Sequence, residues 1–373
     1  MNSAIVFIKN DKELQLAKAK ILGKTLVEYT LFELKRLDLD NLYIVGGNEF
    51  NFENVVNRRD VNDIVKDLKE RDGKCLFVSP FYPLITKKDY AKLINNKDQN
   101  GSVLLDQDDA CVAFMLPNNQ LQTYDKCDLN ELSLLKTEAK RIKELQEVPE
   151  FCDEMKLKIN TKLIEKGVNI IDPFSTYISQ DSVIDKDTTI YPNTVIEGKC
   201  KIGKGNVISG SSFLVNTTIG NNNVIEDSRI SDSSIHNRCH IGPFAQIRKD
   251  SKLADDIIIG NYVEIKNSTI GDKTRISHLA YIGDATVGDD VNIGCGAVTI
   301  NYDGSRKYPT IIKNHAFIGS NSSLIAPITI GEYSMVAAGS TVNHDVMDGD
   351  MAISRLYQTN KKGYGFRYIN KEN

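Results

Sequence analysis

The chain has 373 residues, 41% of them hydrophobic, and a formal net charge of −4 from 46 Lys and Arg against 50 Asp and Glu. This length predicts two or three domains. The small negative charge excludes nucleic acid as the main partner, because no global positive field would attract phosphates. No apolar run approaches the ~18 residues of a membrane span, and the N-terminus lacks the pattern of a signal peptide. We therefore expect a cytoplasmic protein without membrane insertion. Seven cysteines without a Cys-x-x-Cys pair predict reduced thiols, not a disulfide framework or a zinc site.

Residues 1–127 alternate short apolar runs with segments of helical spacing. Strands are predicted at residues 4–8, 42–45, 75–78 and 112–115, with helices at 25–37 and 61–70. This alternation favours an α/β domain with a parallel sheet. Residues 128–170 are rich in Lys, Glu and Leu. They predict a helical linker arm, broken near Pro149, that leads to the next domain.

From residue 178 onward an aliphatic residue recurs at every sixth position, with some five-residue steps. The first run is Ile178, Ile184, Ile190, Ile196, Ile202, Ile208 and Leu214, and the last is Ile312, Ile318, Leu324, Ile330, Val336 and Val342. Neither a helix nor an alternating strand of a β-sandwich has this period. A hexapeptide repeat is typical of a parallel β-helix, in which three repeats make one triangular coil of about 18 residues. We predict such a β-helix of about nine coils over residues 171–350, followed by a basic, Tyr-containing tail over 351–373 that cannot continue it.

The register of the repeat predicts where polar side chains meet. Arg248 and Lys266 each follow an aliphatic residue of one face and are separated by three hexapeptides, so they should stack ~5 Å apart on successive coils. Two stacked cations repel each other, and an anionic ligand would relieve the repulsion; the alternative is a pair of splayed, solvated side chains. We expect His278, Tyr281 and Asn292 at the same corner, where the histidine would be a general base beside a phosphate site.

Two further segments adjoin this corner. Cys295 is expected one coil beyond His278, and the repeat is interrupted at residues 301–310 (NYDGSRKYPT). Such an excursion from a solenoid is usually a surface loop at a functional face.

Several longer strings are more specific than the hexapeptide pattern. IGPFAQIRKD, GNYVEIKNS, RISHLAYIGDATVGDD, GCGAVTINYDG, FIGSNSSLIAPITIG and AISRLYQT closely resemble the bacterial bifunctional N-acetylglucosamine-1-phosphate uridyltransferase/glucosamine-1-phosphate acetyltransferase family. The resemblance covers residues 158–360. It implies a left-handed parallel β-helix and a homotrimer with active sites between subunits. It also implies transfer of acetyl from acetyl-CoA to the amine of glucosamine 1-phosphate, a step toward UDP-N-acetylglucosamine and cell-wall polymers.

The resemblance also implies roles for individual residues. His278 matches the general base, and Arg248, Lys266, Tyr281 and Asn292 match residues that hold the sugar phosphate. The matches to acetyl-CoA contacts are Cys295, Asn301, Tyr302, Lys307, Ser320, Ala338 and Arg355. Direct transfer needs no covalent intermediate, so Cys295 is not expected to carry the acetyl group.

The N-terminal half resembles the uridyltransferase part of the family at residues 20–47 and at VSPFYPLIT, but its catalytic parts do not match. No glycine precedes Gly23, so backbone N–H groups cannot closely approach nucleotide phosphates. Phe81 stands where the family has a metal-binding aspartate, and a phenyl ring cannot ligate Mg²⁺. We therefore expect a degenerate nucleotidyltransferase-like α/β domain over residues 1–127, without uridyltransferase activity and without a bound metal.

Three alternatives stay open at this point. The chain is bifunctional if an unrecognised loop retains UDP-N-acetylglucosamine diphosphorylase activity. It is a noncatalytic trimeric scaffold or regulatory subunit if the β-helix serves only for assembly. A different amino sugar as acceptor would change only the substrate. The shortened N-terminal domain either stabilises the trimer or binds a partner enzyme.

Overall fold

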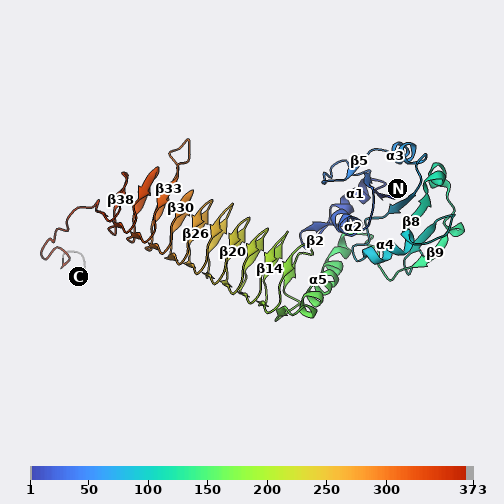
Figure 1. Cartoon of the computed structure of the whole chain (residues 1–373). Helices are drawn as coiled ribbons and strands as arrows, with labels where there is room; N and C mark the ends of the chain where they lie inside the picture. The colour runs from blue at the N-terminus through green and yellow to red at the C-terminus, as the bar shows by residue number, and fades with distance from the viewer. Residues whose placement is uncertain (1, 367–373) are drawn as a thin grey trace. The chain divides into compact units, whose positions relative to one another are not determined.

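The structure is a computed structural model that describes residues 2–366, and the chain divides into two compact units, Met1–Ile159 and Asn160–Asn373. Figure 1 colours the first unit from blue to green and the second from green to red. Within the described residues, no helix is both long and apolar enough to cross a membrane.

A seven-stranded sheet forms the centre of the first unit. Its spatial order is β5 (Val56–Arg58), β4 (Asn41–Val45), β1 (Ser3–Phe7), β6 (Lys74–Val78), β8 (Cys111–Pro117), β7 (Ser102–Leu105) and β9 (Ser133–Lys136). The four predicted strands are confirmed as β1, β4, β6 and β8, but the prediction of a parallel sheet is only partly right. Strands β5, β4, β1 and β6 are parallel, whereas β8 is antiparallel to both β6 and β7. The connection from β7 to β8 is a short turn, and so short a connection joins antiparallel strands.

Helices cover both faces of this sheet. They are α1 (Asp11–Ala17), α2 (Leu26–Leu34), α3 (Val61–Leu68) and α4 (Lys87–Ile94), with the 3₁₀ helix η1 (Asn118–Lys126) and a short hairpin of β2 (Lys20–Ile21) and β3 (Lys24–Thr25). Successive residues of β1 point to opposite faces: Ala4 and Val6 belong to the core with α2, whereas Ile5 belongs to the core with α3. This explains why the strands are continuous apolar runs.

The linker arm predicted for residues 128–170 is helical over only part of that range. The 3₁₀ turns η2 (Leu129–Glu131) and η3 (Leu145–Glu147) flank the edge strand β9, and helix α5 extends over Val148–Glu165. Pro149 lies in the first turn of α5 and does not break it. A proline is tolerated there because the first-turn N–H groups have no partner within the helix.

The second unit is a triangular parallel β-helix with three faces, as predicted (Figure 1). Face 1 has β10 (Asn169–Ile170), β13 (Thr189–Ile190), β16 (Val207–Ser209), β19 (Val224–Glu226), β22 (His240–Ile241), β25 (Ile258–Asn261), β28 (Arg275–His278), β31 (Asn292–Ile293), β34 (Phe317–Ile318), β37 (Met335–Val336) and β39 (Met351–Ala352). Face 2 has β11 (Tyr177–Ile178), β14 (Val195–Glu197), β17 (Phe213–Val215), β20 (Arg229–Ser231), β23 (Gln246–Arg248), β26 (Glu264–Lys266), β29 (Tyr281–Gly283), β32 (Val298–Ile300), β35 (Ser323–Ile325) and β38 (Thr341–Val342). Face 3 has β12 (Val183–Ile184), β15 (Lys201–Ile202), β18 (Thr218–Ile219), β21 (Ser234–Ile235), β24 (Lys252–Leu253), β27 (Thr269–Ile270), β30 (Ala285–Val287), β33 (Thr310–Ile312) and β36 (Ile328–Ile330).

The aliphatic residue of each hexapeptide points into the prism. Ile247, Ile265 and Ile282 pair in register on successive coils of face 2, and all three are buried. The strands are short because the chain turns at every corner, and many corner residues have positive φ, among them Phe244 and Tyr262. Since each strand buries about one aliphatic side chain, stability comes from stacking coils, as in other solenoids.

Two features depart from the regular repeat. Residues between β32 and β33 leave the stack as an excursion, visible in Figure 1 as the orange loop beside β33. Because of this excursion, Thr299 and its partner Leu324 on the next coil are farther apart along the chain than paired residues of the regular coils. The tail was expected not to continue the prism, but Met351 and Ala352 pair with β37 as the last strand of face 1. Residues 367–373 of the predicted tail lie outside the described residues.

Candidate functional site

Face 2 brings the predicted cations together. Arg248 pairs with Lys266, and Lys266 pairs with Gly283 on the next coil, so one column holds all three positions. Gly283 has room for no side chain, because a Cβ there would lie 2.4 Å from the hydroxyl of Tyr281 and 2.8 Å from Nδ2 of Asn301. The Tyr281 ring therefore lies along its own strand and ends beside the column of Arg248 and Lys266.

Arg248 is not a free cation in this structure. Its Nε donates a 2.8 Å hydrogen bond to Oε1 of Glu264, and Nη2 donates to the same oxygen. Glu264 is the first residue of β26, two positions before Lys266. The predicted repulsion between stacked cations is thus partly offset by a carboxylate that the sequence analysis did not include.

A second lysine strengthens the positive charge around Lys266. Lys307, which comes from the excursion, lowers the pKa of Lys266 below its usual value, and the charges of Arg248 and Lys249 add to this effect. Asp284 anchors Lys307 at 3.6 Å and also accepts a hydrogen bond from Asn301. We call Arg248, Lys266 and Lys307 the cationic cluster. A bound anion would favour the charged form of Lys266.

His278 ends strand β28 at the corner between faces 1 and 2, and its side chain is exposed. Its Nδ1 lies 2.8 Å from Oδ1 of Asn261, which pairs with it on the preceding coil. A carbonyl oxygen only accepts hydrogen bonds, so Nδ1 is the donor in this contact, and a neutral ring then has its lone pair on Nε2. This is the tautomer that a general base requires.

Beyond His278, three of the predicted acetyl-CoA contacts follow on successive coils at the same corner. The N–H of Asn321 donates to the carbonyl of Cys295, and the N–H of Gly339 donates to that of Ser320, which places Cys295, Ser320 and Ala338 in one line at ~4.8 Å per coil. Arg355 lies beside this line, 3.9 Å from the position that a Cβ on Gly339 would take. Within the described residues, no hydrogen bond engages the N–H of Cys295.

Not all predicted residues share one corner, so that part of the prediction is wrong. Asn292 begins strand β31 on face 1, at the opposite end of that strand from the corner of His278. Arg248 and Lys266 are the last residues of their strands, so they lie at the far end of face 2 from the corner of His278. Asn301, Tyr302 and Lys307 lie at that same far end, where Tyr302 and Lys307 form a bridge at the base of the excursion. The hexapeptide period predicts the face on which a residue lies. It does not predict the end of the strand, because the corners between strands differ in length.

Sequence reasoning missed Asn261, Glu264 and Asp284. Each one holds a predicted residue: Asn261 bonds to His278, Glu264 to Arg248, and Asp284 to Lys307. Asn261 lies directly before His278 in the stack, one coil earlier on the same face. A polar residue one coil before each predicted site residue is therefore a sequence signal that would have identified Asn261.

The N-terminal unit offers no magnesium ligand at the position where the resemblance places one. Phe81 is 1% exposed and belongs to the core, and Arg141 lies over its ring at 5.6 Å. A buried phenyl group supplies no oxygen ligand, so Phe81 itself cannot hold a magnesium ion.

The chain is similar in sequence to several known proteins. A family model described as bacterial transferase hexapeptide (six repeats) matches residues 309–344. The bifunctional protein GlmU of Caldicellulosiruptor saccharolyticus is 50% identical over 214 residues, which make up 57% of this chain and 46% of that protein. GlmU of Geobacillus thermodenitrificans is 40% identical over 334 residues, or 88% of this chain and 69% of that protein. The chain belongs to the GlmU family.

The repeat of this GlmU-family chain is thus a left-handed parallel β-helix of hexapeptides. The chain spans about half the length of curated GlmU relatives such as those of Caldicellulosiruptor saccharolyticus and Halalkalibacterium halodurans, at 46% and 47% of their lengths. Among solved structures, an Arabidopsis UDP-N-acetylglucosamine acyltransferase is 19% identical, with a TM-score of 0.32 over 47% of this chain and 70% of that one. At that TM-score the two do not superpose closely, and the β-helix is assigned from its strand pairs.

Proposed function

We propose that the chain is an acetyltransferase that moves the acetyl group of acetyl-CoA onto the amine of glucosamine 1-phosphate. The observation that carries the proposal is the hydrogen bond from His278 to Asn261 at one end of face 2, together with the cationic cluster at the other end of the same face. A correctly oriented base and a phosphate-binding surface on neighbouring strands are what this reaction needs. The product, N-acetylglucosamine 1-phosphate, would feed the synthesis of UDP-N-acetylglucosamine for cell-wall polymers.

The chemistry follows from the positions of these groups. The cationic cluster binds the sugar phosphate and orients the amine. As the amine nitrogen attacks the thioester carbonyl, Nε2 of His278 accepts its proton. The free N–H of Cys295, one coil beyond, can stabilise the oxyanion that forms. Collapse of that intermediate breaks the C–S bond, and the departing CoA thiolate takes a proton back from His278.

Acetyl transfer to glucosamine 1-phosphate, followed by mass spectrometry, tests the proposal. We expect His278→Ala to lower kcat by at least about 100-fold, since general bases contribute on this scale. His315→Ala is the matched control, because His315 is another exposed histidine of the β-helix and lies 3.3 Å from Asp290, away from the cationic cluster. Near-native turnover of a folded His278→Ala variant would show that the base is assigned incorrectly. If calorimetry detects no acetyl-CoA binding, the scaffold alternative is favoured instead.

We further propose that the N-terminal unit does not transfer uridylyl groups. The segment after β1 would have to hold the nucleotide phosphates, but its own side chains occupy its backbone donors. The N–H of Lys9 donates to Glu13 at 2.7 Å, and the N–H of Glu13 donates to Asn10 at 3.0 Å. An assay of pyrophosphate release from UTP and N-acetylglucosamine 1-phosphate on the same preparation should therefore be negative. Release at a rate comparable to acetyl transfer would establish the bifunctional alternative.

The proposed enzyme is a homotrimer that works in the cytoplasm. In support of assembly, three apolar side chains stand beside His278: Phe244, Tyr262 and Leu279 are 55%, 60% and 59% exposed. Their exposure would be removed by a second copy of the chain packed against the corner. In support of the compartment, all seven cysteines are free thiols, which is typical of a reducing environment.

A further inference from the structure

The N-terminal unit contains a cavity that the proposed acetyl transfer does not use. It has a volume of about 600 Å³, within the range of small-molecule sites. It lies at the carboxyl ends of β1 and β6, which are neighbours in the sheet, and β1 separates β6 from β4. In open α/β sheets, ligands bind at this kind of position, where successive connections depart in opposite directions.

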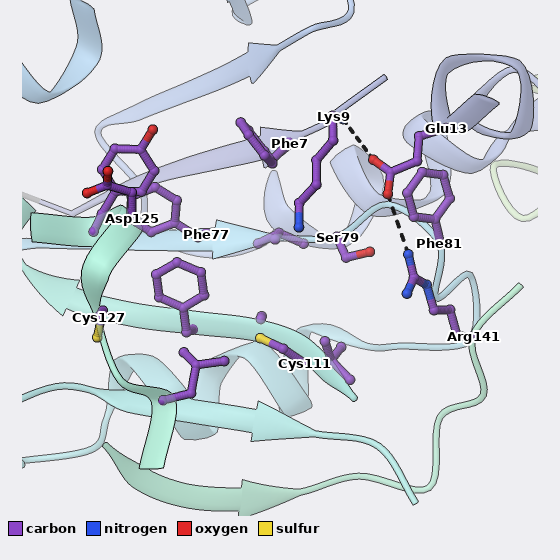
Figure 2. A pocket seen from close by; sticks show the side chains of 16 residues that line it. Phe7, Lys9, Glu13, Phe77, Ser79, Phe81, Cys111, Asp125, Cys127 and Arg141 are labelled. Carbon is purple, nitrogen blue, oxygen red and sulfur yellow. Dashed lines mark hydrogen bonds and ion pairs between the residues drawn. The ribbon is translucent and has the colours of Figure 1, made fainter. Parts of the chain in front are cut away.

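One end of the cavity is aromatic. Figure 2 shows Phe7, Phe77 and their neighbouring rings gathered on one side. Phe77 stacks with Phe114 at a centroid distance of 4.6 Å and with Tyr124 at 5.4 Å, with interplanar angles of 3° and 9°. Parallel rings of this kind present flat surfaces against which a further planar ring can pack.

The other end holds Lys9, Glu13 and Arg141, of which Glu13 and Arg141 are already paired. The fourth charged lining residue, Asp125, lies at the aromatic end in Figure 2 and has no hydrogen bond or ion pair within residues 2–366. Glu13 lies 3.6 Å from Arg141 and also accepts the Lys9 N–H. The ammonium of Lys9 is different: it points into the cavity in Figure 2, and it has no hydrogen bond or ion pair within residues 2–366. The hydroxyl of Ser79 also lines the cavity and likewise has no hydrogen-bond partner in that range. One free cation and one free hydroxyl thus face the space between the two ends.

A triphosphate does not fit this arrangement. The N–H groups of Lys9 and Glu13, after β1, are occupied by side chains of the same segment, and the buried ring of Phe81 offers no oxygen ligand to a metal ion. Lys9 and Arg141 are balanced by Glu13 and Asp125 among the lining residues, so the lining has no net positive charge to offset three or four negative charges. Because Arg141 is paired with Glu13, Lys9 is the cation left to pair with a ligand, and it can pair with one negative charge.

We propose that this cavity binds a small aromatic molecule with a single acidic group, placing its ring against Phe77, Phe114 and Tyr124 and its acid on the Lys9 ammonium. The acid is a carboxylate, which carries a single negative charge and accepts hydrogen bonds from an ammonium and a hydroxyl. This site is separate from the acetyl-transfer site, and the proposal stands whether or not the chain transfers acetyl groups.

The test uses the full chain and naphthalene-2-carboxylate as a fluorescent probe. The chain has no tryptophan, so the naphthalene signal is easily separated from the protein's own. We expect a Kd on the order of 0.1 mM, as for other ligands of this size. Lys9→Met should weaken binding about tenfold, the usual effect of losing a charge-assisted hydrogen bond. Neutral 2-naphthalenemethanol should bind the native chain and Lys9→Met equally. Phenyl phosphate, which carries about two negative charges at pH 7, should bind more weakly than benzoate.

Lys12→Met is the matched control. Lys12 belongs to the same helix, α1, but its side chain is 81% exposed and does not line the cavity. Thermal unfolding of each variant checks that the fold is intact, and Tyr124→Leu provides a second variant that should weaken the probe through its ring. Equal affinity of the native chain and Lys9→Met would overturn the proposal, as would equal losses in Lys9→Met and Lys12→Met. Tighter binding of Mg²⁺·UTP, with displacement of the probe, would also overturn it.

Discussion

At the scale of single residues, the proposed base depends on the side chain behind it. His278 is exposed, and the only hydrogen bond of its ring within the described residues is the one from Nδ1 to Asn261. Without that acceptor the ring can rotate and can carry its proton on Nε2, where it cannot accept another. Asn261 is therefore a positioning residue, and it acts through His278 without touching the reacting atoms.

Substitutions of Asn261 should therefore change kcat according to whether the new side chain can accept the Nδ1 proton. Asn261→Ala should lower kcat about tenfold, as losses of orienting partners commonly do, while KM for both substrates stays within about twofold. Asn261→Asp should restore most of kcat, because a carboxylate also accepts the Nδ1 proton. Steady-state kinetics with both substrates measures the two constants separately. An unchanged kcat in Asn261→Ala would mean that the tautomer is set by something else.

The same residues show where sequence reasoning on the site succeeds and where it ends. Arg248 and Lys266 are one coil apart and do stack, because the repeat fixes their faces. Asn261 and Glu264 were missed because their roles depend on side-chain reach between coils, which a period does not describe. Asn292 was misplaced for a related reason: the repeat fixes the face of a strand, but not which of its two ends adjoins the neighbouring site.

At the scale of the elements, side chains at one corner join consecutive coils. Asp255 accepts hydrogen bonds from the N–H and Nδ2 of Asn237, and Asp272 accepts one from the N–H of Asp255. The hydrogen bond from the Asn237 backbone, helped by the nearby Arg238, lowers the pKa of Asp255 below its usual value. Such a carboxylate contributes stability that is present above the unfolded-state pKa, near 4, and is lost as the pH falls through the lowered folded value.

We therefore predict that Asp255→Asn makes the chain less sensitive to acid. Asparagine already occupies the equivalent position at Asn237, so it can accept the same backbone hydrogen bond. At pH 7 the variant should melt slightly lower than the native chain, because it loses the ion pair with Arg238. Between pH 5 and pH 3, its melting temperature should fall less steeply. Melting curves across this range measure both slopes. Asp185→Asn is the control, because Asp185 lies at the same corner on an earlier coil but its carboxylate has no hydrogen bond or ion pair within residues 2–366. Equal slopes for the native chain and Asp255→Asn would contradict the prediction.

The two units differ in how far their elements follow from local pattern. In the β-helix each coil repeats the same contact, so one aliphatic per hexapeptide predicts both strand and face, as at Ile259, Ile276 and Ile293. In the first unit the pairing of β8 with β6 joins segments that lie far apart along the chain, such as Cys75 and Leu116. Local alternation predicts such strands but not their direction, and it misses edge strands such as β9, which carries exposed Leu134.

At the scale of the whole molecule, the proposed assembly and the proposed activity depend on the same corner. Phe244 and Tyr262 stack with ring centroids 5.7 Å apart, and Leu279 follows on the next coil, directly after His278. Folding alone gives no reason to expose these side chains, because a left-handed corner favours small polar residues such as asparagine. Their exposure is explained if another copy of the chain covers the corner and closes the active site.

The last prediction separates assembly from folding. Phe244→Asn with Tyr262→Asn keeps a residue type that tolerates positive φ and removes the apolar surface, so the variant should fold. Light scattering should then show a monomer in place of a trimer, and acetyl transfer should fall in parallel because each site would lack its neighbour. Tyr333→Asn is the matched control: Tyr333 also has positive φ and is 67% exposed, but it stacks on His315 at a different corner. A double variant that stays trimeric would place the interface elsewhere, and a fully active monomer would show that one chain holds the complete site.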